Sequence, residues 1–139
     1  MIFGIGTDLV ATERFIPWTT FNYERLMRIF SPQEIADATT AGVILPEKLA
    51  VRFAAKEAFY KALSAAMGTL GNTMPPMSLL ALCGNVHVVR GHLGAPYLLV
   101  NWGYLNTLFA CTLPSMTVHV SLSHEKTVAV AFVVISESV

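Results

Sequence analysis

The chain has 139 residues and no net charge, with 54% hydrophobic and only 13% charged residues. This length predicts one domain, residues 1–139, and the apolar composition predicts a large subunit interface. The balanced charge argues against nucleic acid as a partner, because phosphate backbones are bound by basic surfaces. No apolar run is long enough for a membrane span and the N-terminus lacks the basic flank of a signal peptide, so we expect a cytoplasmic protein.

The first predicted element is a β-strand at Ile2–Val10, where β-branched residues alternate with a period of two. Asp8 lies on the same face as Gly4 and Gly6, which leave room for a ligand or another backbone beside the carboxylate. A second interpretation of the same residues is that Asp8 caps a helix beginning near Thr12, since aspartate is a favoured N-cap. The sequence alone leaves both open.

Short helical pieces are predicted for residues 11–30, interrupted at Pro17. The next helix has a strong start signal, because Ser31 suits the N-cap and Glu34 completes a capping box. We expect this helix to end between residues 40 and 42.

The longest predicted helix covers residues 46–63, PEKLAVRFAAKEAFYKAL, with Pro46 at a favourable first position. Glu57 and Lys61 are four residues apart and therefore share a stripe with apolar residues, which is unusual for charges. They form either an ordinary surface ion pair or a metal ligand with a neighbouring phosphate contact. The second interpretation requires another carboxylate from elsewhere in the chain.

The remainder of the chain is predicted to be mostly strand. Glycines in residues 64–74 indicate a helix end and a loop. The pattern then predicts a hairpin of strands 77–90 and 97–101, with His87 on its solvent or interface face, a helix at 102–113 and a second hairpin within 117–135. The expected fold class is α+β, with the long central helix packed on an antiparallel sheet of the N-terminal strand and the later hairpins. Cys83 and Cys111 are expected to be reduced thiols.

The segment VHVSLSHEK near the C-terminus carries polar side chains that suit phosphate binding. Ser123 shares a strand face with His119, and His124 opens the following turn. Serine and histidine can donate hydrogen bonds to phosphate oxygens, although both histidines also allow a purely structural role. Zinc ligation and a serine hydrolase are not indicated, because neither a cysteine–histidine metal spacing nor a nucleophile-elbow serine is present.

Four segments, GIGTDLV, RFAAKEAFYKAL, GAPYL and HVSLSHEKTVAVAFVVI, occur in that order along the chain. Their order and spacing resemble holo-acyl-carrier-protein synthase, the short bacterial type of 4′-phosphopantetheinyl transferase, over nearly the whole length. The resemblance implies a transferase of fatty acid biosynthesis that moves the phosphopantetheine arm of coenzyme A to a serine of apo acyl carrier protein and releases adenosine 3′,5′-bisphosphate. The alternative is a coenzyme A or carrier-protein binding module of the same fold that has lost transfer.

The resemblance also implies catalytic roles. Asp8 and Glu57 would bind Mg²⁺, and Lys61 would stabilise the charge that develops on the leaving bisphosphate. Either Glu57 or a metal-bound water would accept the serine proton. The contacts to coenzyme A would come from Arg52, Lys56, Gly94, Pro96, Ser123 and His124.

Two further expectations follow from the resemblance. The family forms homotrimers with sites between neighbouring subunits, and an acidic carrier protein would dock on Arg14 and Arg28. Where the family commonly has a Gly-Thr-Gly turn after the central helix, this chain has Ser64–Thr69, SAAMGT, so the helix can run beyond Leu63.

Overall fold

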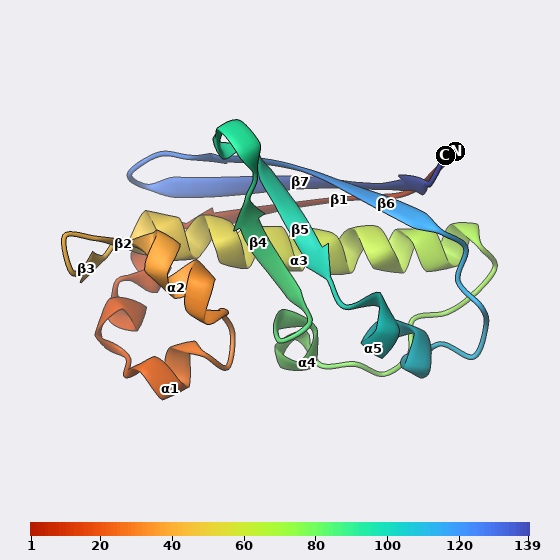
Figure 1. Cartoon of the computed structure of the whole chain (residues 1–139), viewed down its shortest axis with the longest axis horizontal. Coiled ribbons are helices and arrows are strands. Elements are labelled where there is room, and N and C mark those ends of the chain that lie inside the picture. Colours follow the sequence, from red (N-terminus) through yellow and green to blue (C-terminus); the bar gives the residue numbers. More distant parts are fainter.

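A long helix beneath an antiparallel sheet organises the computed structural model, which describes all residues 1–139 (Figure 1). The sheet has three strands in the order β1-β7-β6, and every neighbouring pair is antiparallel. This confirms the predicted α+β fold, with the central helix packed on an antiparallel sheet, but the hairpin predicted within residues 77–101 does not join that sheet. The elements are β1 (Ile2–Ala11), β6 (Met116–His124), β7 (Val128–Glu137) and the helix α3 (Pro46–Thr69).

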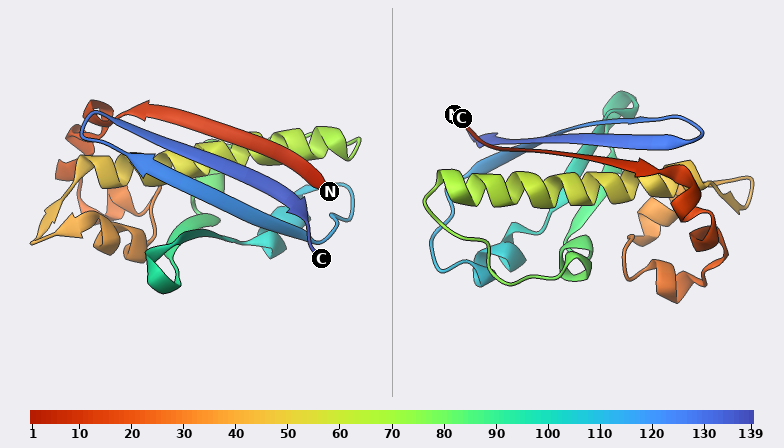
Figure 2. Two further views of the ribbon diagram at one scale, coloured as in Figure 1. Left: turned by 90° about the horizontal axis from the view of Figure 1, so that it is seen from above. Right: turned by 180° about the vertical axis from the view of Figure 1, so that it is seen from behind.

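Short elements pack around the other sides of α3, as the two views in Figure 2 show. A second hairpin, β4 with β5, crosses α3 on the side away from β1, and a small β2–β3 hairpin precedes the helix. None of the helices combines the length and apolarity needed to cross a membrane. The short elements are η1 (Thr12–Phe15), η2 (Pro17–Thr20), α1 (Tyr23–Leu26), α2 (Pro32–Ala38), β2 (Thr39–Thr40), β3 (Val43–Ile44), α4 (Leu79–Cys83), β4 (Val86–Arg90), η3 (His92–Gly94), β5 (Pro96–Val100) and α5 (Trp102–Leu108).

Strand β1 lies directly against the backbone of α3 because two of its residues have no side chain. A Cβ atom at Gly6 would stand 2.0 Å from the carbonyl oxygen of Ala58, and one at Gly4 would stand 2.1 Å from that of Ala62. The bare face predicted for β1 is therefore occupied by another backbone, which places Asp8 beside α3. The helix-cap interpretation of Asp8 is wrong, since β1 continues to Ala11 and η1 begins without a side-chain cap.

Most predicted elements are confirmed, and the differences have local causes. The Ser31–Glu34 capping box is present, whereas α3 runs to Thr69, six residues beyond Leu63 (69 − 63 = 6). The strand predicted from residue 77 is wrong over its first half, which is helix α4, capped by the Ser78 hydroxyl. A short apolar run such as SLLALC fits a buried helix and a buried strand equally well.

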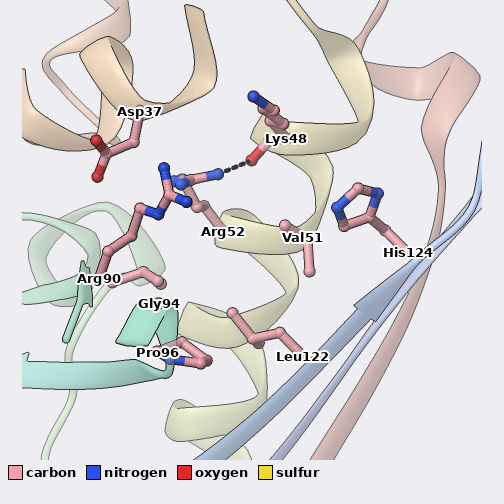
Figure 3. Close-up of a pocket in the computed structure, with 10 residues that line it drawn as sticks. Asp37, Lys48, Val51, Arg52, Arg90, Gly94, Pro96, Leu122 and His124 are labelled. Carbon is pink, nitrogen blue, oxygen red and sulfur yellow. Dashed lines mark hydrogen bonds between the residues drawn. The ribbon is translucent and has the colours of Figure 1, made fainter. Parts of the chain in front are cut away.

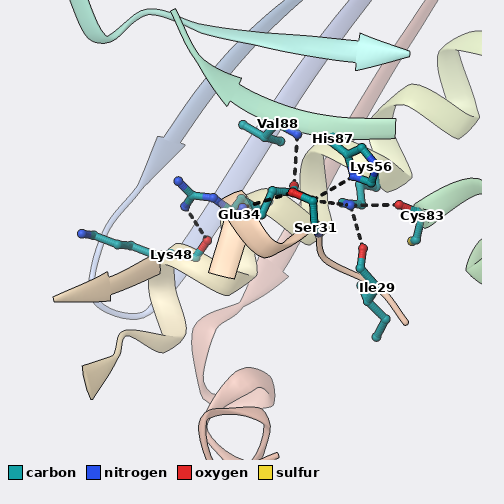
Figure 4. Close-up of polar contacts among 9 residues, drawn as sticks. Ile29, Ser31, Glu34, Lys48, Lys56, Cys83, His87 and Val88 are labelled. Carbon is teal, nitrogen blue, oxygen red and sulfur yellow. Dashed lines mark hydrogen bonds and ion pairs between the residues drawn. The ribbon is translucent and has the colours of Figure 1, made fainter. Parts of the chain in front are cut away.

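A buried ionic network joins α2, α3, α4 and β4 (Figure 4). The Lys56 ammonium donates to the carbonyl oxygen of Ile29 at 2.6 Å, to Glu34 Oε1 at 2.8 Å and to the carbonyl oxygen of Cys83 at 3.0 Å. The second oxygen of Glu34 accepts from the backbone N–H of Val88 at 3.0 Å. His87 Nδ1 lies 3.2 Å from Glu34 Oε1. His87 lies on the less buried face of β4, as predicted, but its side chain is only 26% exposed because it contacts the network.

The network changes the acid–base behaviour of its members. Burial raises the pKa of Glu34, but the hydrogen bond to His87 and the charge of Lys56 outweigh it, so the pKa lies below its ordinary value of 4.5. Burial also lowers the pKa of Lys56, against the opposing effect of Glu34. The Cys83 thiol is free, as expected, and burial raises its pKa to about 11.

The contact between β1 and α3 can be tested by Gly6→Ala. The added methyl group would meet the Ala58 carbonyl oxygen, and we expect a loss of about 1–3 kcal/mol in the free energy of unfolding, or more if the backbone cannot shift. Gly68→Ala is the matched control, because no atom lies within 4 Å of the position of its added Cβ and alanine favours helix. Urea unfolding measures both. Equal stability of the two variants would contradict the close-packing argument.

The buried network predicts a pH-dependent effect of Glu34→Gln. Because the folded pKa of Glu34 lies below the unfolded value near 4.5, its ionised form stabilises the fold above pH 4.5, and this contribution disappears as the pH falls through the folded pKa. We expect the variant to lose about 3–5 kcal/mol at pH 7, because the buried Lys56 loses its ionic partner. The difference in the free energy of unfolding between the variant and the wild type should therefore become smaller in acid.

Urea unfolding at pH 7 and at about pH 3 measures this effect. Glu24→Gln, at an exposed position outside the network, is the control. A stability gap that is the same at both pH values would show that the Glu34 charge does not stabilise the fold.

Candidate functional site

Asp8 stands in the middle of β1, opposite Ala131 of β7, with its side chain turned toward α3. The carboxylate is 8% exposed, and its Oδ1 accepts a hydrogen bond from Lys61 Nζ at 3.0 Å. Lys61 also donates to the carbonyl oxygen of Thr7 at 2.9 Å. The other oxygen, Asp8 Oδ2, is buried and accepts no hydrogen bond. A buried carboxylate oxygen without a partner is costly unless a ligand completes it.

Glu57 supplies a second carboxylate at the same place. It precedes Lys61 by one helical turn on α3, so the two side chains leave the helix toward β1. Burial and the negative charge of Asp8 raise the pKa of Glu57, while Arg14 and Lys61 act in the opposite direction. The surface-pair interpretation of Glu57 and Lys61 is therefore wrong, because Lys61 pairs with Asp8.

These two carboxylates fit a magnesium ion. The structure contains no group of three or more histidine, cysteine or acidic side chains that could hold a metal on their own. Mg²⁺ typically uses only one or two protein carboxylates, together with substrate phosphate and water. The unpartnered oxygen of Asp8 and the repulsion between Asp8 and Glu57 both suit a cation at this point.

The predicted partner-binding arginines both lie among the short elements that follow β1. The Arg14 guanidinium stands 5.6 Å from the ring centre of Phe53, which precedes Glu57 by one turn of α3. Arg28 is exposed and lines a pocket of about 400 Å³ with Asn22, Glu24 and Arg25. Arg14 is thus beside the carboxylate pair, and Arg28 lies on the surface formed by the short N-terminal helices.

A second, basic pocket opens between α2, α3, the β4–β5 hairpin and the end of β6 (Figure 3). Its volume is about 260 Å³. Three cations and one histidine face a single carboxylate, which makes the pocket suitable for phosphate groups. It is lined by Asp37, Lys48, Val51, Arg52, Val88, Arg90, Gly94, Pro96, Leu122 and His124.

Arg52 is the most buried cation of this basic pocket. It is 7% exposed, and its Nη1 donates to the carbonyl oxygen of Lys48 at 2.9 Å. Its Nε is buried without an acceptor. Burial lowers the pKa of Arg52, while Asp37 and Glu34 raise it, and a guanidinium stays charged at neutral pH. An anion in the basic pocket would satisfy this unpaired donor.

The structure gathers four of the six predicted coenzyme A contacts in the basic pocket: Arg52, Gly94, Pro96 and His124. Lys56 is a correction, since its ammonium is fully buried and already has three acceptors within the chain. Ser123 is adjacent to His124 but is exposed and does not line the basic pocket.

Sequence reasoning missed three charged residues of the basic pocket, namely Asp37, Lys48 and Arg90. The sequence contained information that could have predicted two of them. Lys48 precedes Arg52 by four residues, which places both on one face of a helix. Arg90 pairs with Pro96 across the predicted hairpin, beside the glycine turn. Asp37 gave no signal, because nothing in the sequence places α2 beside β4.

The carboxylate pair and the basic pocket lie on opposite sides of α3. Lys61 follows Arg52 by nine residues (61 − 52 = 9), which is two and a half turns at about 3.6 residues per turn. Strand β7 lies between β1 and β6, so β1 and β6 are about 10 Å apart. In Figure 1 the β4–β5 hairpin passes in front of α3 and β1 passes behind it. Within one chain, the helix stands between the two groups of residues.

Comparisons with known proteins identify the family of the chain. The model of the 4′-phosphopantetheinyl transferase superfamily matches residues 4–131. Holo-[acyl-carrier-protein] synthase of Treponema pallidum is 39% identical over 135 residues, which cover 97% of this chain and 96% of that protein. The protein of the same name from Dechloromonas aromatica is 38% identical over 142 residues, covering 99% and 100%.

Solved structures give the same result. The ACPS–CoA complex of Chronobacterium ammoniagenes has a TM-score of 0.75 and 25% identity, covering 97% of both chains. A holo-(acyl-carrier-protein) synthase from Bacillus anthracis, in complex with CoA (3′,5′-ADP), has a TM-score of 0.63 and 31% identity, covering 99% of both. With motifs, fold and full-length relatives in agreement, the chain belongs to the holo-[acyl-carrier-protein] synthases of the 4′-phosphopantetheinyl transferase superfamily.

Proposed function

We propose that this protein transfers 4′-phosphopantetheine from coenzyme A to a serine of apo acyl carrier protein and releases adenosine 3′,5′-bisphosphate. The observation that carries the proposal is the contact of Asp8 with Lys61 beside Glu57, with one carboxylate oxygen left unpartnered. Displacement at a phosphorus atom depends mainly on positioning and on neutralising charge. Asp8, Glu57 and Lys61 would together position a phosphate and neutralise its charge.

Asp8 and Glu57 would hold Mg²⁺, which neutralises phosphate charge and fixes the reacting groups. The Asp8 carboxylate holds the Lys61 ammonium, whose side chain is 53% exposed and can therefore meet a substrate. Lys61 would stabilise the bisphosphate as it leaves and is able to protonate it. Either Glu57 or a metal-bound water would accept the serine proton.

The basic pocket would bind the phosphates of the nucleotide. Arg52 has a buried donor without an acceptor, and Lys48 and Arg90 add two further cations. Because the basic pocket lies across α3 from Glu57, one chain does not present both groups to one coenzyme A molecule. We therefore propose that each site combines the carboxylate pair of one copy with the basic pocket of its neighbour, within the homotrimer that the family resemblance implies.

An uncovered apolar surface supports assembly. The face of the sheet turned away from α3 exposes large apolar side chains, with Ile5 51%, Leu9 69% and Phe132 45% exposed. Such a surface is typical of a subunit interface. The acidic carrier protein would approach from the other direction and dock on Arg14 and Arg28.

Mass spectrometry of apo acyl carrier protein, incubated with coenzyme A, Mg²⁺ and this protein, tests the reaction. We expect a gain of roughly 340 Da, the mass of one phosphopantetheine joined through a phosphodiester, and no gain in EDTA. Glu57→Ala should reduce the rate by about 100-fold or more, because it removes a metal ligand. Glu47→Ala, in the first turn of the same helix, should retain activity.

Normal transfer by a folded Glu57→Ala variant would refute the metal-site assignment. Failure of the wild-type protein with several carriers, despite coenzyme A binding, would favour the non-catalytic binding module.

The shared site can be tested by complementation. One variant carries Glu57→Ala, and the other carries both Lys48→Ala and Arg90→Ala. Each should be inactive alone. In trimers assembled from equal amounts of both, one site in four should combine an intact carboxylate pair with an intact basic pocket, giving about a quarter of wild-type activity. Absence of complementation after confirmed subunit exchange would show that each site lies within one chain.

A further inference from the structure

The basic pocket contains one carboxylate among its cations, and phosphate binding alone does not account for it. Asp37 projects from α2 toward the guanidinium groups of Arg52 and Arg90 (Figure 3). Gln33, one turn earlier on the same helix, donates from Nε2 to Asp37 Oδ1 at 3.0 Å and so holds the carboxylate in this position. Asp37 therefore places a negative charge in a pocket that otherwise suits anions.

Asp37 acts on the arginines without pairing with them. Burial lowers the pKa of Arg52, and the charge of Asp37 is the largest effect in the opposite direction. Asp37 nevertheless forms no ion pair with Arg52 or Arg90, and the Nε of Arg52 has no acceptor. The arginines thus keep donors for a phosphate, and the carboxylate stands beside the space that the phosphate would occupy.

A carboxylate and a phosphate in one pocket repel each other. An ionised carboxylate only accepts hydrogen bonds, and the oxygens of an ionised phosphate are also acceptors. No hydrogen bond between the two groups offsets the repulsion of their charges. At a separation of a few Å in a partly solvated pocket, this repulsion is large enough to change an affinity several-fold. Asp37 therefore opposes the binding that Lys48, Arg52 and Arg90 favour.

The proposed reaction increases the charge that Asp37 meets. The serine oxygen forms a bond to the phosphorus that carries the arm, and the bond from that phosphorus to the bridging oxygen of the pyrophosphate breaks. The bridging oxygen and the electron pair of the broken bond remain on the nucleotide, while the serine proton goes to the base. The 5′-phosphate thereby changes from a diester with one negative charge to a monoester with nearly two at pH 7.

We infer that Asp37 promotes release of adenosine 3′,5′-bisphosphate by weakening the binding of this product in the basic pocket. This inference rests on the proposed function. Asp37 opposes each phosphate in the basic pocket, but it opposes the product more than coenzyme A, because the nucleotide gains a charge in the transfer. Product release limits the turnover of many enzymes. Asp37 thus determines specificity between substrate and product.

Calorimetric binding of both ligands to the wild type and to Asp37→Asn tests the inference. Asparagine keeps the shape of the side chain and an acceptor for Gln33. We expect the Kd for adenosine 3′,5′-bisphosphate to fall about fivefold and the Kd for coenzyme A to fall about twofold. Glu137→Gln is the matched control. It removes one negative charge at the end of β7, whereas His124 of the basic pocket pairs with the start of β7, so both Kd values should stay unchanged.

The sign of the expected change separates this inference from a structural role. If Asp37 served only to organise Arg52 and Arg90, Asp37→Asn would bind both ligands more weakly, whereas we expect tighter binding and stronger inhibition of transfer by the product. Weaker or unchanged binding of the product by Asp37→Asn would overturn the inference, and so would an equal gain for the two ligands. The wild-type protein tests the proposed function separately, because loss of transfer there would refute that function whatever the variant binds.

Discussion

The structure depends on the direct backbone contact between β1 and α3. Gly4 and Gly6 remove the side chains that would otherwise hold the strand and the helix apart. The same close approach brings Asp8 beside Glu57 and Lys61, which are 49 and 53 residues later in the chain (57 − 8 = 49; 61 − 8 = 53). The glycines of GIGTD are therefore as important to the site as the aspartate, although neither glycine presents any group to a substrate.

Local patterns predicted much of this arrangement. The capping box, the long helix and the C-terminal hairpin all follow from short-range rules, and the meeting of Asp8 with Glu57 follows from the family motifs. Residues 79–83 were missed because an apolar run does not distinguish a buried helix from a buried strand. Lys56 was misplaced because its partner, Glu34, lies 22 residues earlier in the chain. Burial of a charge depends on such distant pairing, which local rules do not describe.

The division of the site across α3 is also a property of tertiary structure. Helical periodicity predicts which side chains lie on the same face of a helix. It places Arg52 and Lys61 on opposite faces, because they are two and a half turns apart. Only the packed structure shows what fills the space between them, namely the helix itself under β7. The apolar composition, which predicts a subunit interface, and the two-sided helix are independent observations that support the proposed homotrimer.

Between Leu49 and Met67, helix α3 has little surface that is free to vary. Fourteen of the helix's 24 residues are buried, and the alanines that face β1 leave no space for a larger side chain. In a scan of random substitutions, most positions from Leu49 to Met67 should therefore be intolerant, whether or not they meet a substrate. Intolerance along this helix would therefore report packing as well as function. The β4–β5 turn, which forms another wall of the basic pocket, is not subject to this constraint.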